Sequence, residues 1–290
     1  MIPKRKFNAV LFRWYKKYGR HDLPWRHTKN PYHILVSEMM LQQTQVSRAL
    51  LKYREFLRRF PTVAALANAP LGDVLRTWSG LGYNRRARYL HDCAKAIVAR
   101  ASVWPKTFSE LLELPGVGPS TAAAISSFAF GADEPMIDTN IRRIIARVFF
   151  RPLVIASEAR QSYKLPSDKT IYALAKTLIP REKGREWNWA MMDVGALLCK
   201  ARMHNARCPF QILHGPVADF VYKKPQTKFA GSDRYYRGRI LAQLVATPKG
   251  LPTATLRRML ALPQKKLTAL IALLMRESLL KKSGRRFLLP

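Results

Sequence analysis

Acidic residues are scarce in this sequence of 290 residues. There are 18 Asp and Glu against 51 Lys and Arg, so the formal charge is 51 − 18 = +33. A positive excess of this size exceeds what solubility requires, attracts polyanions and steers association with nucleic acid. A disordered basic tail is excluded, because 48% hydrophobic and 10% aromatic residues are enough to build cores. The composition therefore indicates a basic globular protein with a nucleic-acid partner.

Long apolar runs and cysteines are also missing. No uninterrupted apolar run reaches the roughly 18 to 20 residues of a membrane span, and residues 1–20 lack the apolar region and cleavage site of a signal peptide. The three cysteines, Cys93, Cys199 and Cys208, form no disulfide framework, which fits a reducing compartment. We expect a cytoplasmic monomer with no membrane partner, associated with the nucleoid if the source is bacterial.

Strand-like alternation is almost absent from the chain. Helical periodicity instead runs from residue 4 to about residue 205, with apolar residues at steps of three and four. Pro61, Pro70 and Gly80 are among the residues that punctuate this pattern. Residues 151–168 interrupt the pattern and are typical of a surface loop. The sequence predicts an all-α body.

The pattern changes toward the C-terminus. Gly, Pro and Lys interrupt every helical pattern in residues 216–235, which predicts a linker. Residues 236–290 follow with three short amphipathic segments and a basic end, SGRRFLLP, that can form a hairpin. This order predicts a winged-helix-like domain. Such domains often enter DNA grooves, although many bind only protein, so the sequence leaves both partners open.

The most specific local motif is ELLELPGVGPSTAAAISSFAFG, residues 110–131. One helix ends at a Leu-Pro step, a turn with Gly116 and Gly118 follows, and a second helix begins near Pro119. Glycines let the backbone approach a phosphate closely, and the amides that open the second helix are aligned with its dipole. A purely structural turn is the alternative. The charge of +33 favours a helix-hairpin-helix motif that grips DNA without reading its sequence.

This hairpin is one of seven blocks that occur in the order expected for a known family. The sequence resembles the helix-hairpin-helix DNA glycosylase superfamily and, within it, the MutY adenine glycosylases. The blocks are WYKKYGRHDLPWR (14–26), SEMMLQQTQV (37–46), FPTVAALANAP (60–70), WSGLGYNRRARYLH (78–91), LPGVGPST (114–121), IDTNIRRI (137–144) and WAMMDVGALLC (189–199). The resemblance implies a six-helix barrel at 28–133 and a second helical lobe made from 1–27 and 134–215.

Two acids, Glu38 and Asp138, stand at the positions of the family's catalytic carboxylates. Hydrolysis of the adenine N-glycosidic bond needs a proton on the base and a negative charge beside the developing sugar cation. Glu38, on an apolar helix face, is the candidate proton donor that also handles water. Asp138 is the candidate that stabilises the cation or bonds the sugar transiently. Taken singly, Asp138 could be only a helix N-cap and Glu38 only a paired surface acid. We expect the two acids to face each other across a cleft between the lobes.

Position 120 separates two chemistries. Bifunctional relatives similar to endonuclease III carry a lysine there, whose amine forms a Schiff base and nicks the strand. The hydroxyl of Ser120 cannot do this, so the resemblance implies a monofunctional glycosylase. Ser120 as a mere helix cap is compatible with that interpretation.

Base flipping requires side chains that fill the hole in the duplex and hold the strand. Tyr83 and Gln43 match the family's wedge positions, and Trp25 matches a position near the flipped adenine. A core role is the alternative for Trp25 and Tyr83. The resemblance assigns DNA or base contacts to the following residues: Trp25, Arg26, Leu41, Gln43, Thr44, Leu81, Tyr83, Gly116, Gly118, Ser120 and Asn140.

The family's 4Fe–4S cluster needs four cysteines, but the segment after GALL reads CKARMHNARCPFQILHG. Only Cys199 and Cys208 fall near ligand positions, and His214 stands where a fourth cysteine is expected. Two cysteines cannot assemble a four-thiolate cluster. The two cysteines could hold zinc with His204 and His214, but their spacing follows no familiar finger. We expect no metal and no cofactor, with helix packing and basic side chains in place of the cluster loop.

The C-terminal region is a second departure from the family. Many MutY proteins inspect 8-oxoguanine with a Nudix-like domain that residues 216–290 do not resemble, which leaves another mismatch preference open. We expect a base-excision repair enzyme that hydrolyses adenine opposite 8-oxoguanine or guanine in double-stranded DNA. One alternative is a thymine or uracil mismatch glycosylase on the same scaffold, against which the LPWR and LQQTQ blocks argue. A non-catalytic DNA-binding protein is the other, against which the two carboxylates argue.

Overall fold

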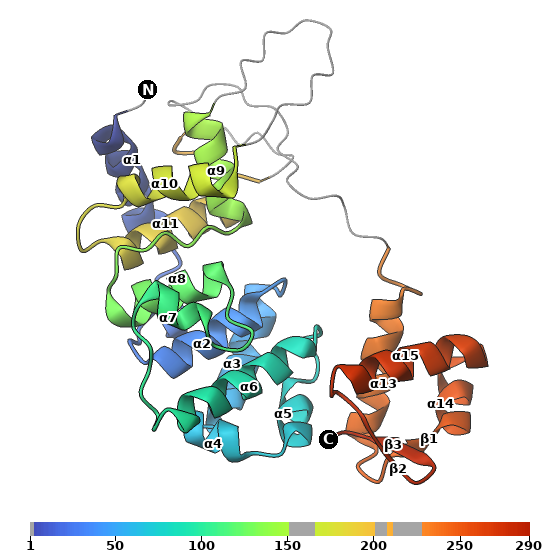
Figure 1. Cartoon of the computed structure of the whole chain (residues 1–290). Helices are drawn as coiled ribbons and strands as arrows, with labels where there is room; N and C mark the ends of the chain where they lie inside the picture. The colour runs from blue at the N-terminus through green and yellow to red at the C-terminus, as the bar shows by residue number, and fades with distance from the viewer. Residues whose placement is uncertain (1–2, 151–165, 201–207, 211–227) are drawn as a thin grey trace, which may run out of the picture. The chain divides into compact units, whose positions relative to one another are not determined.

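The structure, a computed structural model, describes residues 3–150, 166–200, 208–210 and 228–290 (Figure 1). The chain forms two compact units. Unit 1 comprises Met1–Ile34, Lys106–Leu112 and Gly118–Lys224, and unit 2 comprises Leu35–Pro105, Glu113–Val117 and Pro225–Pro290. The two lobes predicted from the sequence, 28–133 and 1–27 with 134–215, have other boundaries than these units, and they stay a prediction. Among the described helices, none has the length and apolar character of a membrane span.

Unit 1 consists of helices that pack around α11. Its elements are α1 (Lys4–Tyr18), the 3-10 turn η1 (Pro24–Arg26), α7 (Phe108–Leu112), α8 (Pro119–Phe130), α9 (Thr139–Phe149), α10 (Asp168–Leu178) and α11 (Gly184–Leu197). Helices α1, α8 and α9 all contact α11. Trp187 of α11 and Leu11 of α1 are fully buried, and the Phe7 ring stacks on Phe210 with centroids 4.7 Å apart. Since each large apolar side chain contributes roughly 1.5–3 kcal/mol on burial, this seam holds the unit together.

The first part of unit 2 is also helical. It contains α3 (Val46–Arg59), α4 (Val63–Asn68), α5 (Leu71–Trp78) and α6 (Arg85–Ala99). Helix α6 packs on α4 and α5, and α3 packs on α5 through the edge-to-face pair of Phe56 and Trp78. Helix α2 (Pro31–Leu41) begins in unit 1 and ends in unit 2. These helices confirm the predicted all-α body.

The second part of unit 2 is a winged helix. It contains α13 (Asp233–Ala246), β1 (Leu251–Pro252), α14 (Thr253–Leu260), α15 (Gln264–Arg276), β2 (Lys281–Ser283) and β3 (Arg286–Leu288). The strands form an antiparallel sheet in the order β1-β3-β2, with Leu251 opposite Phe287. This arrangement confirms the predicted winged-helix-like domain.

Two details of the C-terminal region differ from the sequence-based expectation. Helix α13 begins at Asp233, inside the predicted linker, because the Ser232 side chain caps its N-terminus by accepting from the N–H of Tyr235. Strand β1 was not expected, because only two of its residues pair. Residues 151–165 of the predicted surface loop and 216–227 of the predicted linker lie outside the described residues.

Candidate active site and DNA-binding loops

Asp138 is the N-cap of α9. Its Oδ1 accepts hydrogen bonds from the backbone N–H groups of Asn140 and Ile141, both at 2.8 Å, and its Oδ2 accepts one from Asn140 Nδ2 at 2.9 Å. The capping role considered from the sequence is therefore present. It is compatible with catalysis, because the cap fixes the direction of the carboxylate at the positive end of the helix dipole.

Buried polar groups pin the segment that leads to Asp138. Asn188 of α11 has no exposed surface; its Oδ1 accepts from the N–H of Met136 at 2.9 Å, and its Nδ2 donates to the carbonyl of Glu134 at 2.8 Å. Asp133 accepts from the N–H of Gly184 at 2.9 Å and so ties the same segment to the start of α11. Breaking such buried bonds leaves unsatisfied groups at a cost of about 1–3 kcal/mol each, so the segment is firmly held.

A close approach of α9 to α11 positions Asn140. A Cβ added to Gly195 would lie 2.4 Å from the Cβ of Asn140, so only glycine permits this contact. Asn140 Oδ1 accepts from Arg143 Nη2 at 2.7 Å, and the same nitrogen donates to the carbonyl of Gly195 at 2.8 Å. The bonds therefore run from Arg143 through Asn140 to the carboxylate of Asp138.

The carboxylate of Asp138 has lost hydration. Burial raises the pKa of this half-buried group above its ordinary value, although hydrogen bonds from Ile141 and Asn140 and the charge of Arg143 act to lower it. A carboxylate that has lost water gains more from a neighbouring cation than a hydrated one does. The site is therefore suited to stabilising a positive charge.

Glu38 lies in the last turns of α2, whose side chains are largely buried. The residue is only 8% exposed, and its neighbours Ser37, Met39 and Met40 are buried as well. This burial does not fit the alternative of a surface acid.

Arg26 is held by an ion pair that sequence reasoning missed. Its guanidinium donates to both oxygens of Asp193 at 2.8 and 2.9 Å, and Arg20 Nε donates to the same carboxylate at 2.7 Å. Burial alone would raise the pKa of Asp193, but the hydrogen bonds and charges of Arg26 and Arg20 outweigh it and hold this pKa below its ordinary value. Trp25 is buried next to Arg26 in η1. Asp193 lies in the block WAMMDVGALLC, where its position amid apolar residues was the available signal.

The structure brings the predicted wedge residues of unit 2 together in two loops. Gln43 follows α2 with φ at 55°, and Tyr83 precedes α6 with φ at 48°, both in the left-handed region. Such conformations cost roughly 1–3 kcal/mol outside glycine and cluster at functional sites. Leu81 is buried beside them, while the Tyr83 side chain is 43% exposed. The core alternative therefore does not fit Tyr83, whose ring is open to a ligand.

Arg86 of α6 ties the two loops together, a role that sequence reasoning also missed. Its Nη1 donates to the carbonyls of Met39, Met40 and Gln42 at 2.8, 2.9 and 2.6 Å. Its Nη2 donates to the carbonyl of Gly82 at 3.0 Å and to the Thr44 hydroxyl at 3.1 Å. Burial lowers its pKa to about 10, which leaves the guanidinium charged at neutral pH.

The two glycines of the hairpin have different roles. Gly116 has φ at 74°, and a Cβ there would lie 2.4 Å from the Cβ of Tyr89, so the fold requires glycine. Gly118, the N-cap of α8, has an ordinary φ of −94° and open space where its Cβ would be. Its lack of a side chain leaves the first amides of α8 accessible to a phosphate. Ser120 lies in this first turn, half-buried.

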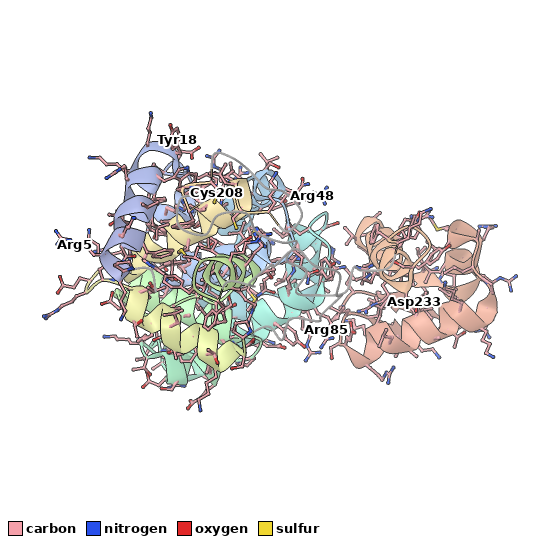
Figure 2. All side chains as sticks on the ribbon, turned by 90° about the horizontal axis from the view of Figure 1, so that it is seen from above. Arg5, Tyr18, Arg48, Arg85, Cys208 and Asp233 are labelled. Atoms are coloured by element: carbon pink, nitrogen blue, oxygen red, sulfur yellow. The ribbon has the colours of Figure 1, made fainter. Side chains whose placement is uncertain are left out.

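Basic side chains cover the surface of both units, as Figure 2 shows for Arg5 of α1 and Arg48 of α3. Two buried arginines of α9 in unit 1 contact the residues that follow α11. Arg147 donates to Cys199 Sγ at 3.2 Å, and Arg143 donates to the carbonyl of Cys199 at 2.5 Å. A hydrogen bond from Cys208 and the charge of Arg147 lower the pKa of the Cys199 thiol although burial raises it.

The described residues hold no group of three or more potential metal ligands. Cys199 is buried and Cys208 is half-buried, and both are free thiols. His204 and His214, the other candidate ligands, lie outside the described residues. A four-thiolate cluster does not fit this chain, because it contains three cysteines in all.

The predicted site residues divide between the units. Trp25, Arg26, Asp138 and Asn140 belong to unit 1 with Gly118 and Ser120; Glu38, Leu41, Gln43, Thr44, Leu81, Tyr83 and Gly116 belong to unit 2. Within each unit the residues have defined neighbours. The convergence of Glu38 and Asp138 on one cleft stays a prediction.

Comparison with known proteins gives consistent relatives. Residues 36–162 match the model of the HhH-GPD superfamily of base excision DNA repair proteins. The chain is 39% identical over 254 residues to the adenine DNA glycosylase of Mycobacterium tuberculosis, covering 84% of this chain and 80% of that protein. It is 38% identical to the adenine DNA glycosylase of Mycolicibacterium smegmatis over 80% of this chain and 78% of that one. A thymine/uracil-DNA glycosylase of Pyrobaculum aerophilum is 33% identical and covered over 97% of its length.

Solved structures give the same fold. A thermostable thymine-DNA glycosylase superposes with a TM-score of 0.65 at 28% identity, covering 73% of this chain and 95% of that one. A non-covalent endonuclease III–DNA complex superposes with a TM-score of 0.60 at 21% identity, which shows the fold alone. The predicted helix-hairpin-helix glycosylase fold is thus confirmed. The chain belongs to the HhH-GPD superfamily of base excision DNA repair proteins and, within it, to the adenine DNA glycosylase family.

Proposed function

We propose that this protein is a monofunctional DNA glycosylase that releases adenine mispaired with 8-oxoguanine or guanine in double-stranded DNA, acting as a monomer. The observation that carries the proposal is the contrast between its two acids. Glu38 is buried in an apolar helix, whereas Asp138 is fixed by amide donors at the start of α9. Two carboxyl groups in different surroundings can act as acid and as cation stabiliser at the same pH.

The reaction follows from these roles. Protonated Glu38 gives its proton to a ring nitrogen of adenine, and the bond between the base and C1′ of the sugar breaks with its electron pair leaving on the base. The carboxylate of Asp138 faces the sugar cation that results. Glu38, now ionised, takes a proton from the water that attacks C1′, which restores the acid. The products are free adenine and an abasic site.

The residue at position 120 determines whether the DNA strand is cleaved after the base has left. Cleavage of the strand through a Schiff base needs an amine, and the hydroxyl of Ser120 provides none. The open Gly118 amides at the start of α8 and the basic surface would hold the phosphate backbone. The protein therefore leaves the abasic strand intact.

We further propose that the enzyme works without a 4Fe–4S cluster or another metal. The guanidinium groups of Arg143 and Arg147 hold the end of α11 by bonding to Cys199 and to the carbonyl of Lys200. These bonds fix a segment that a metal site would otherwise fix. Purified protein should contain iron and zinc far below one atom per chain; stoichiometric iron with a visible absorbance band would refute this point.

A second candidate activity is removal of thymine or uracil from mismatches. It is favoured by the relatives from Pyrobaculum aerophilum and Aeropyrum pernix, named thymine/uracil- and thymine-DNA glycosylase, at 33% and 36% identity. The higher identity and coverage of this chain with the mycobacterial adenine enzymes favour adenine.

Single-turnover assays with a panel of duplexes test the proposal. Adenine or thymine is placed opposite 8-oxoguanine, guanine and cytosine, and base release is measured for the wild type and Glu38→Gln. Adenine should leave fastest opposite 8-oxoguanine or guanine, and Glu38→Gln should lose roughly 10²–10⁴-fold in rate while it still binds duplex. Release of thymine alone, or loss of binding in Glu38→Gln, would overturn the assignment.

A further inference from the structure

The winged helix of unit 2 is anchored to the helices beside it by contacts at two places. The C-terminal Pro290 carbonyl accepts from the N–H of Gly72 at 2.9 Å, where a Cβ would lie 2.5 Å from that oxygen. The carbonyl of Glu277 accepts from Arg88 Nη1 at 2.9 Å, and its carboxylate, 12% exposed, pairs with Arg237. Helix α13 is therefore fixed opposite the loop that carries Tyr83.

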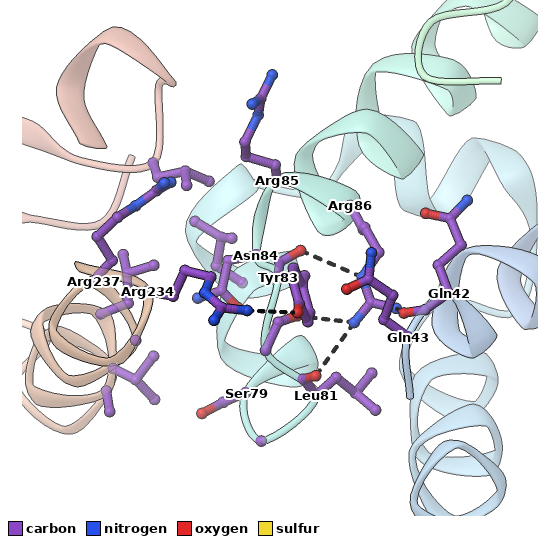
Figure 3. Close-up of a pocket in the computed structure, with 18 of the residues that line it drawn as sticks. Gln42, Gln43, Ser79, Leu81, Tyr83, Asn84, Arg85, Arg86, Arg234 and Arg237 are labelled. Carbon is purple, nitrogen blue, oxygen red and sulfur yellow. Dashed lines mark hydrogen bonds between the residues drawn. The ribbon is translucent and has the colours of Figure 1, made fainter. Parts of the chain in front are cut away.

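A cavity of about 780 Å³ lies between α13 and this loop (Figure 3). Five arginines line it: Arg48 from α3, Arg85 and Arg86 from α6, and Arg234 and Arg237 from α13. Among the described residues that line it, none is acidic. The cavity therefore presents several positive charges to whatever enters it, and its volume falls within the about 300–1,000 Å³ of typical ligand sites.

Another part of the wall is apolar and aromatic. Leu241 and Val245 of α13 and Leu279 after α15 contribute aliphatic surface, and the rings of Tyr83 and Phe229 also line the cavity. Both residues are well exposed, at 43% and 61%. Arginines beside exposed rings and an apolar wall match the two parts of a nucleotide, since phosphates bond to guanidinium groups and bases stack on aromatic rings.

The cavity is continuous with the wedge loops. Gln43 and Tyr83, both in the left-handed region, line it together with Arg86, which fixes their loops. Arg234 Nη1 donates to the Tyr83 hydroxyl at 3.5 Å, so the winged helix reaches the wedge residue itself (Figure 3). DNA that meets these loops would therefore pass the mouth of the cavity.

We propose that α13 completes a nucleotide-binding pocket beside the wedge loops, and that the pocket takes one nucleotide of the DNA strand that these loops enter. The phosphate bonds to Arg48 and Arg234, and the base lies against Tyr83 and the aliphatic side of α13. This inference rests on the proposed function for its substrate, duplex DNA. It assigns the winged helix to DNA binding. The sequence alone left open whether this domain binds DNA or protein.

Two changes test the pocket by different means. Arg48→Ala/Arg234→Ala removes two charges from its wall. Gly238→Trp fills it from α13 without altering charge, because Gly238 lines the cavity and the space around its absent Cβ is open. The matched controls are Arg257→Ala/Arg258→Ala, which removes two exposed charges from α14 outside the pocket, and Gly238→Ala.

The full chain with Glu38→Gln, which prevents turnover, is titrated with duplex containing adenine opposite 8-oxoguanine, and Kd is measured by fluorescence anisotropy. We expect both pocket changes to weaken binding at least tenfold, Arg257→Ala/Arg258→Ala to weaken it less than threefold, and Gly238→Ala to leave it unchanged. A 2-aminopurine is placed in turn at each position near the lesion. At the position that enters the pocket, the fluorescence change seen with the wild-type pocket should be lost with Gly238→Trp, whereas the changes caused by the wedge and by the flipped adenine should remain.

Equal binding by pocket variants and controls would overturn the proposal. So would weaker binding with Arg48→Ala/Arg234→Ala and normal binding with Gly238→Trp, because the charges would then act from the surface and nothing would enter the pocket. Failure of the proposed function is a separate result: the wild type would release no base in the glycosylase assay, whatever these binding constants are.

Discussion

Arg26 of unit 1 and Arg86 of unit 2 are both buried, and their guanidinium groups are satisfied in different ways. Arg26 of unit 1 is paired with the fully buried carboxylate of Asp193. Arg86 of unit 2 pairs with no acid among the described residues; it donates to backbone carbonyls of two loops and to the hydroxyl of Thr44. The first arrangement joins two charges that depend on each other. The second lets a single side chain set the conformation of two segments.

The difference matches what each unit has to do. In unit 1 the carboxylate of Asp138 must keep one direction, and it is held by a network that includes Asn140, Asn188 and Arg143. In unit 2 the strained loops must be ready to meet DNA, and one cation holds them. A single change should therefore damage stability most in unit 1 and loop function most in unit 2.

The largest expected effect is on stability, from Asp193→Asn. Loss of this charge leaves Arg26 buried without a counter-ion, so the free energy of unfolding should fall by about 3–5 kcal/mol. Urea denaturation followed by circular dichroism measures it. Glu186→Gln, which breaks the exposed pair with Lys183, is the control and should cost less than about 1 kcal/mol. Equal losses in the two variants would contradict the role given to the buried pair.

Asp138→Asn should reduce single-turnover adenine release by about 10²–10³-fold, because an electrostatic stabiliser of the sugar cation is lost. The amide oxygen of Asn can still cap α9, so the free energy of unfolding should change by less than about 1 kcal/mol. Rate and urea midpoint are measured on the same preparation. A matching collapse of stability would mean that Asp138 is only a cap.

The raised pKa of Asp138 also predicts a pH dependence. The folded state binds the proton of the Asp138 carboxyl more tightly than the unfolded state does. Below its ordinary pKa of 3.8 this group therefore does not lower the free energy of unfolding. As pH rises from there through the raised pKa, the free energy of unfolding falls. The rate should move the opposite way, falling as acid protonates the carboxylate. In Asp138→Asn this fall in the free energy of unfolding should be absent when urea midpoints are compared over the same pH range. A pH profile of the midpoint that matches the wild type would contradict the prediction.

Arg86→Lys tests the loops of unit 2. A single ammonium cannot serve all the acceptors that the guanidinium serves, so carbonyls lose partners at about 1–3 kcal/mol each. Duplex binding and adenine release should each fall about tenfold or more. Arg100→Lys, at the exposed end of α6, is the control and should behave as wild type. Retention of both activities in Arg86→Lys would mean that the loops keep their conformation without it.

The sequence predicted the elements that depend on local patterns. The helical spacing, the hairpin at 110–131 and the C-terminal winged helix all follow from residues close together in the chain. It could not predict the role of Arg86, because its partners are backbone oxygens up to 47 positions away, and every residue has such an oxygen. The pairing of Arg26 with Asp193 spans 167 positions and depends on how α11 meets η1.

Burial of the two acids illustrates the same limit. The apolar neighbours of Glu38 in SEMML were visible in the sequence, and they indicated a buried helix face. The network around Asp138 was not visible, because Asn188 and Gly195 contribute to it from α11. Local patterns identified which residues carry the chemistry, and long-range contacts decide how they are held.

The smallest expected effects come from the hairpin glycines. Gly118→Ala meets open space and an ordinary φ, so unfolding should change by less than about 0.5 kcal/mol while duplex binding weakens a few-fold, because a methyl group stands beside the phosphate-binding amides. Gly116→Ala should instead lose about 1–2 kcal/mol of stability or more, from its positive φ and its contact with Tyr89. Melting curves and anisotropy titrations separate the two, and identical behaviour would refute the distinction.

A crystal structure of Glu38→Gln bound to duplex DNA with adenine opposite 8-oxoguanine would test whether the two acids act on one flipped adenine. We expect a flipped adenine with the amide introduced at position 38 within about 3.2 Å of a ring nitrogen, and the Asp138 carboxylate facing C1′ from the sugar side. An adenine that stays stacked in the duplex, or that is extruded into a pocket lacking either side chain, would contradict this prediction.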